Sequence, residues 1–467
     1  MYLNKASAAV LLVVTTTLIT GCASPSVIGE RENVVVAPEN WGDSTSVVTV
    51  SDFDNQWLNT LVSADVRTLI QTAIDNNFDL QNKWLTLQAT KKSVEATGAT
   101  LWPSLEMGFS TAERKTATSD GSVASNDLSL TLRYEVDIWG KLSANEKQLN
   151  FSYLSQKASY EQARKTLISN VILSWYGVVE AKLQLQLSEQ RLTNAKQNLD
   201  IIEAGYESGL NSALDVYLSR NDVASEQARV YTQRTVYSSS VRTLEQLLGR
   251  YPAGTEKVIA DELPEVDTDL SANLPSEVVA SNPEIQSAWY TLLAKDAGLA
   301  YAHKQRFPSL SLTANLGQSS EALSDLTSST TTWSILGNLT APLFNAGRLE
   351  ANQEKAEFEA LAAEQSYLQL VNQTFASIEN TLTEIGHLND SFEANKQAAE
   401  NAQIAETLSF EQYVKGLVDY TTVLDAQTRA YSAKSAEIST RFSIIESKMK
   451  LHIALGGNFD SIIGSDK

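Results

Sequence analysis

The chain carries the same sequence unit twice. The motif NFDLQ at Asn77–Gln81 returns as NPEIQ at Asn282–Gln286, an offset of 205 residues. Because repeated units in one chain fold alike, the duplication predicts an architecture with two matching halves. Glycines that punctuate both units recur at an offset of 207 residues: Gly140 and Gly347, Gly209 and Gly416, and Gly249 and Gly456.

Each copy begins with a helix that ends at a proline and continues into two strands. Residues 78–101 and 284–306 lack proline, whereas Pro103 and Pro308 prevent the helices from continuing. The segments that follow alternate between apolar and polar residues, the period of a strand with one apolar face. We therefore expect β-hairpins at 104–137 and 309–341, with exposed loops at Ala112–Asn126 and Gln318–Thr330.

A very long helix is predicted after each hairpin, at 142–207 and at 349–414. At 1.5 Å per residue, each would span about 100 Å. A glycine turn then leads into a returning helix, at 212–248 in the first copy and 419–455 in the second. Apolar residues recur every seven positions, the period of a coiled coil, at Val171, Val178, Leu185, Leu192, Leu199 and Tyr206, and at Leu361, Leu368, Phe375 and Leu382.

The composition excludes several classes of function. The formal net charge is −20, the opposite of what binding to a phosphate backbone requires, so we expect no nucleic-acid partner. Three histidines and one cysteine are scattered along the chain, and the sequence has no phosphate loop, GxSxG elbow or HExxH motif. We therefore expect no catalytic residue, no metal site and no cofactor.

The N-terminal segment has the features of a bacterial lipoprotein signal. An apolar run after Lys5, too short for a stable membrane span, ends in Ile19–Thr20–Gly21–Cys22. A branched aliphatic residue, a small residue and glycine before the chain's one cysteine resemble the site cut by lipoprotein signal peptidase. We predict lipidation of Cys22 and removal of residues 1–21; an ordinary secretory signal is the alternative. The lack of Asp after Cys22 favours the outer membrane of a Gram-negative bacterium.

The predicted fold class is mainly α with a small β part, built from a duplicated unit of long antiparallel coiled-coil helices plus β-hairpins. Four strands cannot close a sheet, and an open sheet edge is not tolerated in lipid. Three chains would supply twelve strands, so we expect a trimeric α-barrel with a 12-stranded outer-membrane β-barrel. The expected divisions are a signal at 1–21, an extended arm at 22–60, repeats at 61–250 and 275–457, a linker at 251–274 and a tail at 458–467.

Two motifs resemble those of a known family, the TolC-type outer-membrane factors. Tyr134–Leu142 (YEVDIWGKL) is similar to the family's strand-to-helix junction, and Gly416–Gln427 (GLVDYTTVLDAQ) to its tip turn. The likeness covers essentially the whole mature chain, and the lipobox indicates the lipoprotein branch that serves resistance-nodulation-division (RND) efflux pumps. It implies a homotrimeric exit duct among outer-membrane lipids that passively conducts small toxic compounds and drugs. Its implied partners are a periplasmic adaptor protein and an inner-membrane RND transporter.

The resemblance also assigns a gate at the periplasmic tip, where the second turn is Gly416–Leu417–Val418 and the first is at Gly209. Asp425 matches an acidic ring position of the family, and Thr422 stands at its second ring position. Asp419 is an additional acid within the turn. Three copies of a carboxylate around a narrow pore would favour cations.

A closing latch is implied as well. Asp215 and Tyr413 match the acid and the tyrosine that link the two tip hairpins in the family. The family's latch arginine is replaced by Val418. We therefore expect a closure that is weaker electrostatically, or one carried by apolar packing of Leu417 and Val418.

Two other functions fit parts of the sequence. A duct for type I protein secretion would have the same architecture, but the lipobox and the YEVDIWGKL junction favour efflux. A periplasmic coiled-coil scaffold lipoprotein would explain the long helices, but it would not need the amphipathic hairpins.

Overall fold

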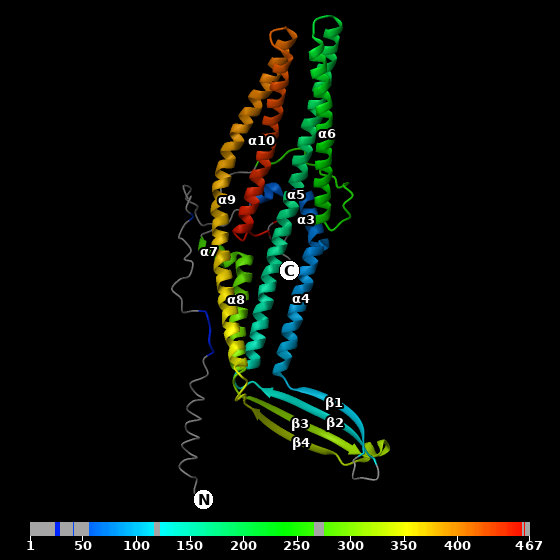
Figure 1. Cartoon of the computed structure of the whole chain (residues 1–467), viewed down its shortest axis with the longest axis vertical. Coiled ribbons are helices and arrows are strands. Elements are labelled where there is room, and N and C mark those ends of the chain that lie inside the picture. Colours follow the sequence, from blue (N-terminus) through cyan, green and yellow to red (C-terminus); the bar gives the residue numbers. More distant parts are fainter. Residues whose placement is uncertain are drawn as a thin grey trace. The chain divides into compact units, whose positions relative to one another are not determined.

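The computed structural model describes residues 24–28, 41, 56–115, 122–265, 275–459 and 462 (Figure 1). Cys22 and the rest of the predicted signal lie outside these residues. The chain divides into two compact units. The first unit comprises Met1–Val35, Leu85–Ser159 and Glu284–Leu370, and the second comprises Val36–Trp84, Tyr160–Pro283 and Val371–Lys467.

The helices reproduce the offset of the sequence repeat. Helices α5 (Lys141–Glu207) and α9 (Arg348–Val414) have 67 residues each, and α6 (Ala213–Leu247) and α10 (Tyr420–Ala454) have 35 each. Each bound in the second copy follows its counterpart by 207 residues, for example 348 minus 141. The predicted fold class, mainly helical with a small sheet, is therefore confirmed. The shorter helices are α2 (Gln56–Leu61), α3 (Ala64–Asn76), α4 (Phe78–Gly98), α7 (Pro275–Ser281) and α8 (Pro283–Lys304).

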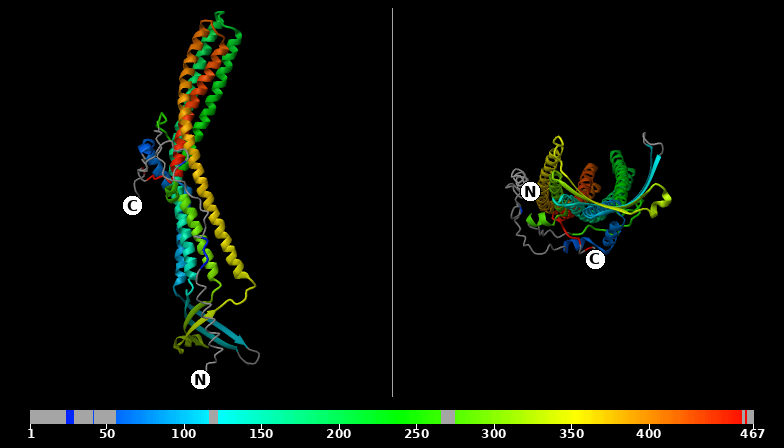
Figure 2. Two further views of the ribbon diagram at one scale, coloured as in Figure 1. Left: turned by 90° about the vertical axis from the view of Figure 1, so that its left-hand side faces the viewer. Right: turned by 90° about the horizontal axis from the view of Figure 1, so that it is seen from below.

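The first unit contains one antiparallel sheet in the order β1-β2-β3-β4, which Figure 2 shows to be curved. Its strands are β1 (Ser104–Lys115), β2 (Ser122–Val136), β3 (Ser309–Ser320) and β4 (Thr332–Thr340). One row of paired residues across the sheet is apolar, and the row beside it is polar, so the sheet has one apolar and one polar face. The apolar row is Met107, Leu130, Leu316 and Trp333; the polar row is Glu106, Thr131, Asn315 and Ser334.

The loops between the strands are shorter than the sequence indicated. The pairing of β1 with β2 continues to Lys115 and Ser122, inside the expected loop Ala112–Asn126. The other expected loop, Gln318–Thr330, contains the end of β3 and a 3₁₀ helix, η2 (Leu323–Ser328). Serine and threonine are compatible with exposed strands as well as with loops. A prediction based on their abundance therefore ended the strands too early.

A tryptophan at the end of the sheet joins the two copies within the first unit. The Trp139 indole Nε1 donates a hydrogen bond to the Pro308 carbonyl at 2.7 Å, and its ring stacks on Phe307 with the centroids 5.3 Å apart. The carboxylate of Asp137 accepts hydrogen bonds from the backbone N–H groups of Leu142 and Ser143, both at 2.9 Å. These contacts fix the start of α5 beside the end of α8.

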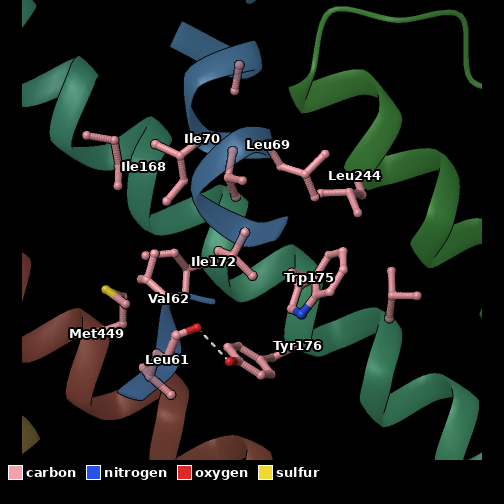
Figure 3. Close-up of a cluster of buried hydrophobic side chains, with 14 of the residues drawn as sticks. Leu61, Val62, Leu69, Ile70, Ile168, Ile172, Trp175, Tyr176, Leu244 and Met449 are labelled. Atoms are coloured by element: carbon pink, nitrogen blue, oxygen red, sulfur yellow. Dashed lines mark hydrogen bonds between the residues drawn. The ribbon is translucent and has the colours of Figure 1, made fainter. Parts of the chain in front are cut away.

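The second unit is built around an apolar core where α2 and α3 pack on α5, α6 and α10 (Figure 3). The Tyr176 hydroxyl is satisfied there by the Leu61 carbonyl, at 2.6 Å. Among the helices of the described ranges, none combines the length and hydropathy needed to cross a bilayer. The fully buried core side chains include Leu58, Leu61, Ile70, Ile168, Ile172, Leu244 and Leu248.

The buried side of α9 differs from the predicted apolar seam. Leu361, Leu368 and Leu382 are only half-buried, whereas Val371, Ile378 and Ile385 are at most 3% exposed. The seven-residue period is thus present, but the fully buried positions are shifted by three residues. Periodicity gives the spacing of a seam and not which of several apolar rows is innermost.

A buried histidine lies near the end of α10. His452 is 1% exposed and packs edge-on against Trp57 and Phe459, with ring centroids 5.7 and 4.8 Å away. Burial, and secondarily the positive charge of Lys165, lower the pKa of His452 to about 4. The folded state therefore holds this ring neutral.

We predict that acid destabilises the second unit through His452. The pKa of His452 is lower in the folded state than its unfolded value near 6.5, so a neutral ring favours folding. This contribution to the free energy of unfolding is complete above pH 6.5 and is lost as the pH falls towards 4. The loss between pH 7.5 and 5 should be about 2 kcal/mol in unfolding free energy. Thermal unfolding at both pH values should show a smaller difference for His452→Leu than for the wild type. The exposed His387 provides the control, since His387→Gln should retain the wild-type difference.

Candidate functional site

Two similar turns lie at the same end of the second unit, where α5 leads into α6 and α9 leads into α10 (Figure 1). At the first turn, the Gly209 N–H bonds to the Tyr206 carbonyl at 2.9 Å and the Leu210 N–H to the Gly205 carbonyl at 2.8 Å. The same pair of bonds closes α9 at Gly416. Both are Schellman endings, which require a left-handed residue, and Gly209 and Gly416 have φ of 75° and 70°.

The helices that follow the turns begin differently. Ser212 caps α6 by accepting a hydrogen bond from the Asp215 N–H at 3.1 Å, and the Asp215 carboxylate accepts one from the Ser212 N–H at 3.2 Å. This is a capping box, so Asp215 has a structural role in starting α6. At the matching place Asp419 is the N-cap of α10, but its side chain makes no capping bond. The Asp419 carboxylate is left exposed at the positive end of a helix.

An apolar cluster joins the two hairpins below the turns. Tyr420 and Val423 of α10 are 1% and 0% exposed, and they share the cluster with Ile202 of α5 and Val216 of α6. Leu417, which we expected to carry apolar closure, is 70% exposed within the chain. The inter-hairpin packing therefore involves the first turn of α10 together with Ile202 and Val216. Half-buried Leu218, Phe410, Tyr413 and Leu424 complete the cluster.

The predicted latch residues lie near one another without a hydrogen bond. Burial and the negative charge of Asp215 raise the pKa of Tyr413 to about 12. The Tyr413 hydroxyl is nevertheless buried with no hydrogen-bond partner among the described residues. Its ring packs against Tyr420, with centroids 5.3 Å apart. This ring contact lies within the second hairpin, and Tyr413 reaches the first hairpin only as a half-buried neighbour of the apolar cluster that holds Ile202 and Val216.

The candidate ring acid lies on the exposed side of α10. Thr422 and Asp425 are one helical turn apart, on the side opposite the buried Val423. The Asp425 side chain is 64% exposed and accepts a hydrogen bond from Arg429 Nε at 3.0 Å. Arg429, which the sequence interpretation did not consider, therefore offsets part of the charge of Asp425.

A buried ion cluster connects the hairpins further from the turns. Glu226 of α6, whose side chain is 2% exposed, pairs with Arg191 of α5 at 3.0 Å and with Arg229 at 3.2 Å. Arg191 also donates a hydrogen bond to the Gln427 carbonyl of α10 at 3.2 Å. Both guanidinium groups face the ring of Tyr431, at 5.0 and 4.7 Å. The sequence interpretation missed this cluster, because its members come from three helices.

The described residues include no group of three or more His, Cys, Asp or Glu side chains that could hold a metal ion. The two hairpins meet instead through one apolar cluster and one ion cluster, and they expose a stripe with Thr422 and Asp425. Such an arrangement can separate, close and discriminate by charge.

Comparisons with known proteins agree with this kind of structure. A family model described as outer membrane efflux protein matches residues 69–250 and again residues 274–457. The toluene efflux pump outer membrane protein TtgF of Pseudomonas putida is 29% identical over 409 residues, which cover 85% of this chain and 84% of TtgF. The probable outer membrane lipoprotein SilC of Salmonella typhimurium is 28% identical over 449 residues, covering 95% and 97%.

The fold is also similar to solved structures. The outer membrane channel CmeC of Campylobacter jejuni superimposes with a TM-score of 0.86 at 20% sequence identity. The match covers 95% of this chain and 96% of that one. At this identity the likeness concerns the fold.

We predict that Val423→Ala loosens the contact between the hairpins. Removing buried methyl groups from a packed cluster should lower the free energy of unfolding by about 2 kcal/mol. Hydrogen–deuterium exchange should quicken in the last turns of α5 and the first turns of α10, next to Ile202 and Tyr420. Val414→Ala, at a position 60% exposed near the same turn, is the matched control and should leave exchange unchanged. Equal exchange in both variants would show that the apolar cluster does not hold the hairpins together.

Proposed function

Because this chain belongs to the outer membrane efflux protein family, we propose that its two hairpins form the gate of an efflux duct. The protein is an outer-membrane channel that conducts small toxic compounds passively, and it is not an enzyme. The observation that carries this assignment is the double match to the family model, once in each sequence repeat. The matched relatives are efflux proteins, which favours efflux over type I secretion and over a scaffold.

The sheet supports a trimeric duct. Its apolar face suits lipid and its polar face suits a water-filled interior. The outer edges of β1 and β4 have no further strand beside them among the described residues. Three copies would pair these edges and close a sheet of twelve strands, and the helices would continue it as a tunnel.

The partners follow from the role of the duct. We propose that the ends of the two hairpins meet a periplasmic adaptor protein, which connects the duct to an inner-membrane RND transporter. The exposed leucines of the turns, Leu210 and Leu417, are 82% and 70% exposed and offer apolar contacts for such a partner. Lipidation at Cys22 is part of the proposal, supported by the lipobox and by the description of the relative SilC as a lipoprotein.

We assign the charge selectivity of the duct to α10. In a trimer, three copies of Asp425 would surround the axis, with Thr422 forming the adjacent neutral ring and Asp419 adding acid at the turn. Arg429 holds each Asp425 carboxylate at 3.0 Å. The pair is exposed, so its attraction is screened and the acid remains available to passing cations.

Closure is assigned to the contacts between hairpins. Asp215 lies near Tyr413, whose ring borders the apolar cluster between the hairpins, and Val418 supplies no charge. The apolar cluster around Val423 and the ion cluster around Glu226 supply the main attraction. Arg191 is paired with Glu226 inside its own hairpin and reaches the other hairpin through the Gln427 carbonyl and the Tyr431 ring, so it favours the closed state.

We predict opposite effects for the two members of the exposed pair. In planar bilayers with a salt gradient, Asp425→Asn should shift the reversal potential towards loss of cation preference. Arg429→Gln should increase the preference, because the acid loses its compensating charge. Thr422→Val changes no charge and should behave as the wild type. An unchanged reversal potential in Asp425→Asn would remove this residue from the selectivity site, and failure of the wild type to form any pore would contradict the duct.

We predict that Arg191→Met raises the conductance of the resting channel, since α10 is held less firmly to α5. The matched control is Arg234→Met, which breaks the exposed pair between Arg234 and Glu189 of the α5–α6 hairpin. This control should retain the wild-type conductance. A disulfide in Val216→Cys/Val423→Cys, within the apolar cluster, should return the Arg191→Met channel to low conductance. Persistent leakage after cross-linking would separate the conductance from hairpin movement.

A further inference from the structure

A groove between α5 and α8 lies at the helical end of the sheet, within the first unit. Its volume is about 350 Å³. It begins four residues after β2 ends, at Gly140, and five residues before β3 begins, at Lys304. Figure 1 shows the two helices side by side next to the strand ends. Small residues on the facing helices leave this space open: Ala144, Ala297 and Ala300, with Phe151 and Leu293 at the far end.

Two lysines give the groove a positive character. Lys304 Nζ donates a hydrogen bond to the Gly140 carbonyl at 3.2 Å, and Lys147 Nζ lies 5.7 Å from the centroid of the Phe151 ring. Neither lysine forms an ion pair with a carboxylate in the part of the chain that the structure describes. Lys304 lies beside Gly140, and Lys147 is seven residues after Gly140, about 10 Å along the helix axis. Two extended lysine side chains can reach a common ligand over this distance.

The single acid in the groove is already engaged by neutral donors. The Asp296 carboxylate accepts hydrogen bonds from the Ser26 hydroxyl at 2.9 and 3.0 Å and from the Val27 N–H at 2.8 Å. Ser24, Pro25 and Ser26 therefore form one wall of the groove. These contacts hold the Asp296 carboxylate against Ser26 and Val27, and the two lysines of the lining exceed its charge by one.

We propose that this groove binds the phosphate of an anionic phospholipid, with Lys304 and Lys147 as its cationic ligands. Lysine is a suitable partner for phosphate as a compact charge with three donors. The groove lies where the apolar face of the sheet ends, so an outer-membrane lipid could reach it with its headgroup. Ser24 also follows the predicted lipid-attachment residue by two positions. The proposal depends on the outer-membrane location and not on how the gate works.

Native mass spectrometry of the detergent-solubilised full-length protein tests this site. Added phosphatidylglycerol should bind at one site per chain, more tightly than phosphatidylcholine does. The double variant Lys147→Gln/Lys304→Gln should weaken that binding about tenfold or more, because two charged hydrogen bonds are lost. Ala300→Leu should also weaken it by filling the groove while both lysines remain. Lys157→Gln, an exposed lysine of α5 outside the groove, should bind as the wild type does.

Three outcomes would overturn the proposal. Equal phosphatidylglycerol binding by the double variant and the wild type would remove the lysines from the site. Displacement of the lipid by millimolar inorganic phosphate would assign the groove to free phosphate. An unacylated Cys22→Ser protein that binds one more lipid per chain than the acylated protein would assign it to the chain's own lipid. None of these outcomes bears on conductance, so the duct can be tested separately.

Discussion

Backbone N–H and C=O groups in a bilayer have no water to bind, and this constraint determines the rest of the structure. The four-stranded sheet satisfies its inner strands, but β1 and β4 each leave one edge without a strand among the described residues. Copies of the chain can satisfy these edges in turn. Once strands surround a common axis, the helices that continue from them must surround it too. In the proposed trimer, a hollow tunnel would be a consequence of sheet closure.

Much of this fold could be predicted because the sequence contains two copies of the same unit. Prolines 103 and 308 end helices, glycines end others, and a shared offset identifies both sets as equivalent. The candidate site was less predictable. Glu226 and Arg191 are 35 positions apart, and they meet because α5 and α6 pack in one particular register. Hydrophobic period gives the spacing of a seam but not its register, so neither this pair nor the burial of Tyr420 could be read from one sequence.

The two copies have diverged at equivalent positions near their turns. Val216 and Val423 occupy equivalent positions and both lie in the apolar cluster. Two residues later, the first copy has Leu218, which packs against that cluster, and the second has the exposed Asp425. Duplication thus provided the same scaffold twice, and substitution gave one hairpin a packing role and the other a charge. A trimer of such chains has three acids at this level although it has six hairpins.

The glycines of the two tip turns differ from the other helix-ending glycines in the space that a side chain would find. A side chain added at Gly209 or Gly416 would meet nothing within 4 Å, so only backbone strain opposes it. At Gly249 it would lie 2.2 Å from the Asn76 carbonyl oxygen and collide with the backbone at the end of α3. A residue that tolerates a left-handed backbone, such as Asn, could therefore replace a tip glycine, whereas Gly249 admits no side chain unless the backbone shifts. A duct built this way can acquire a new partner without having to acquire a new fold.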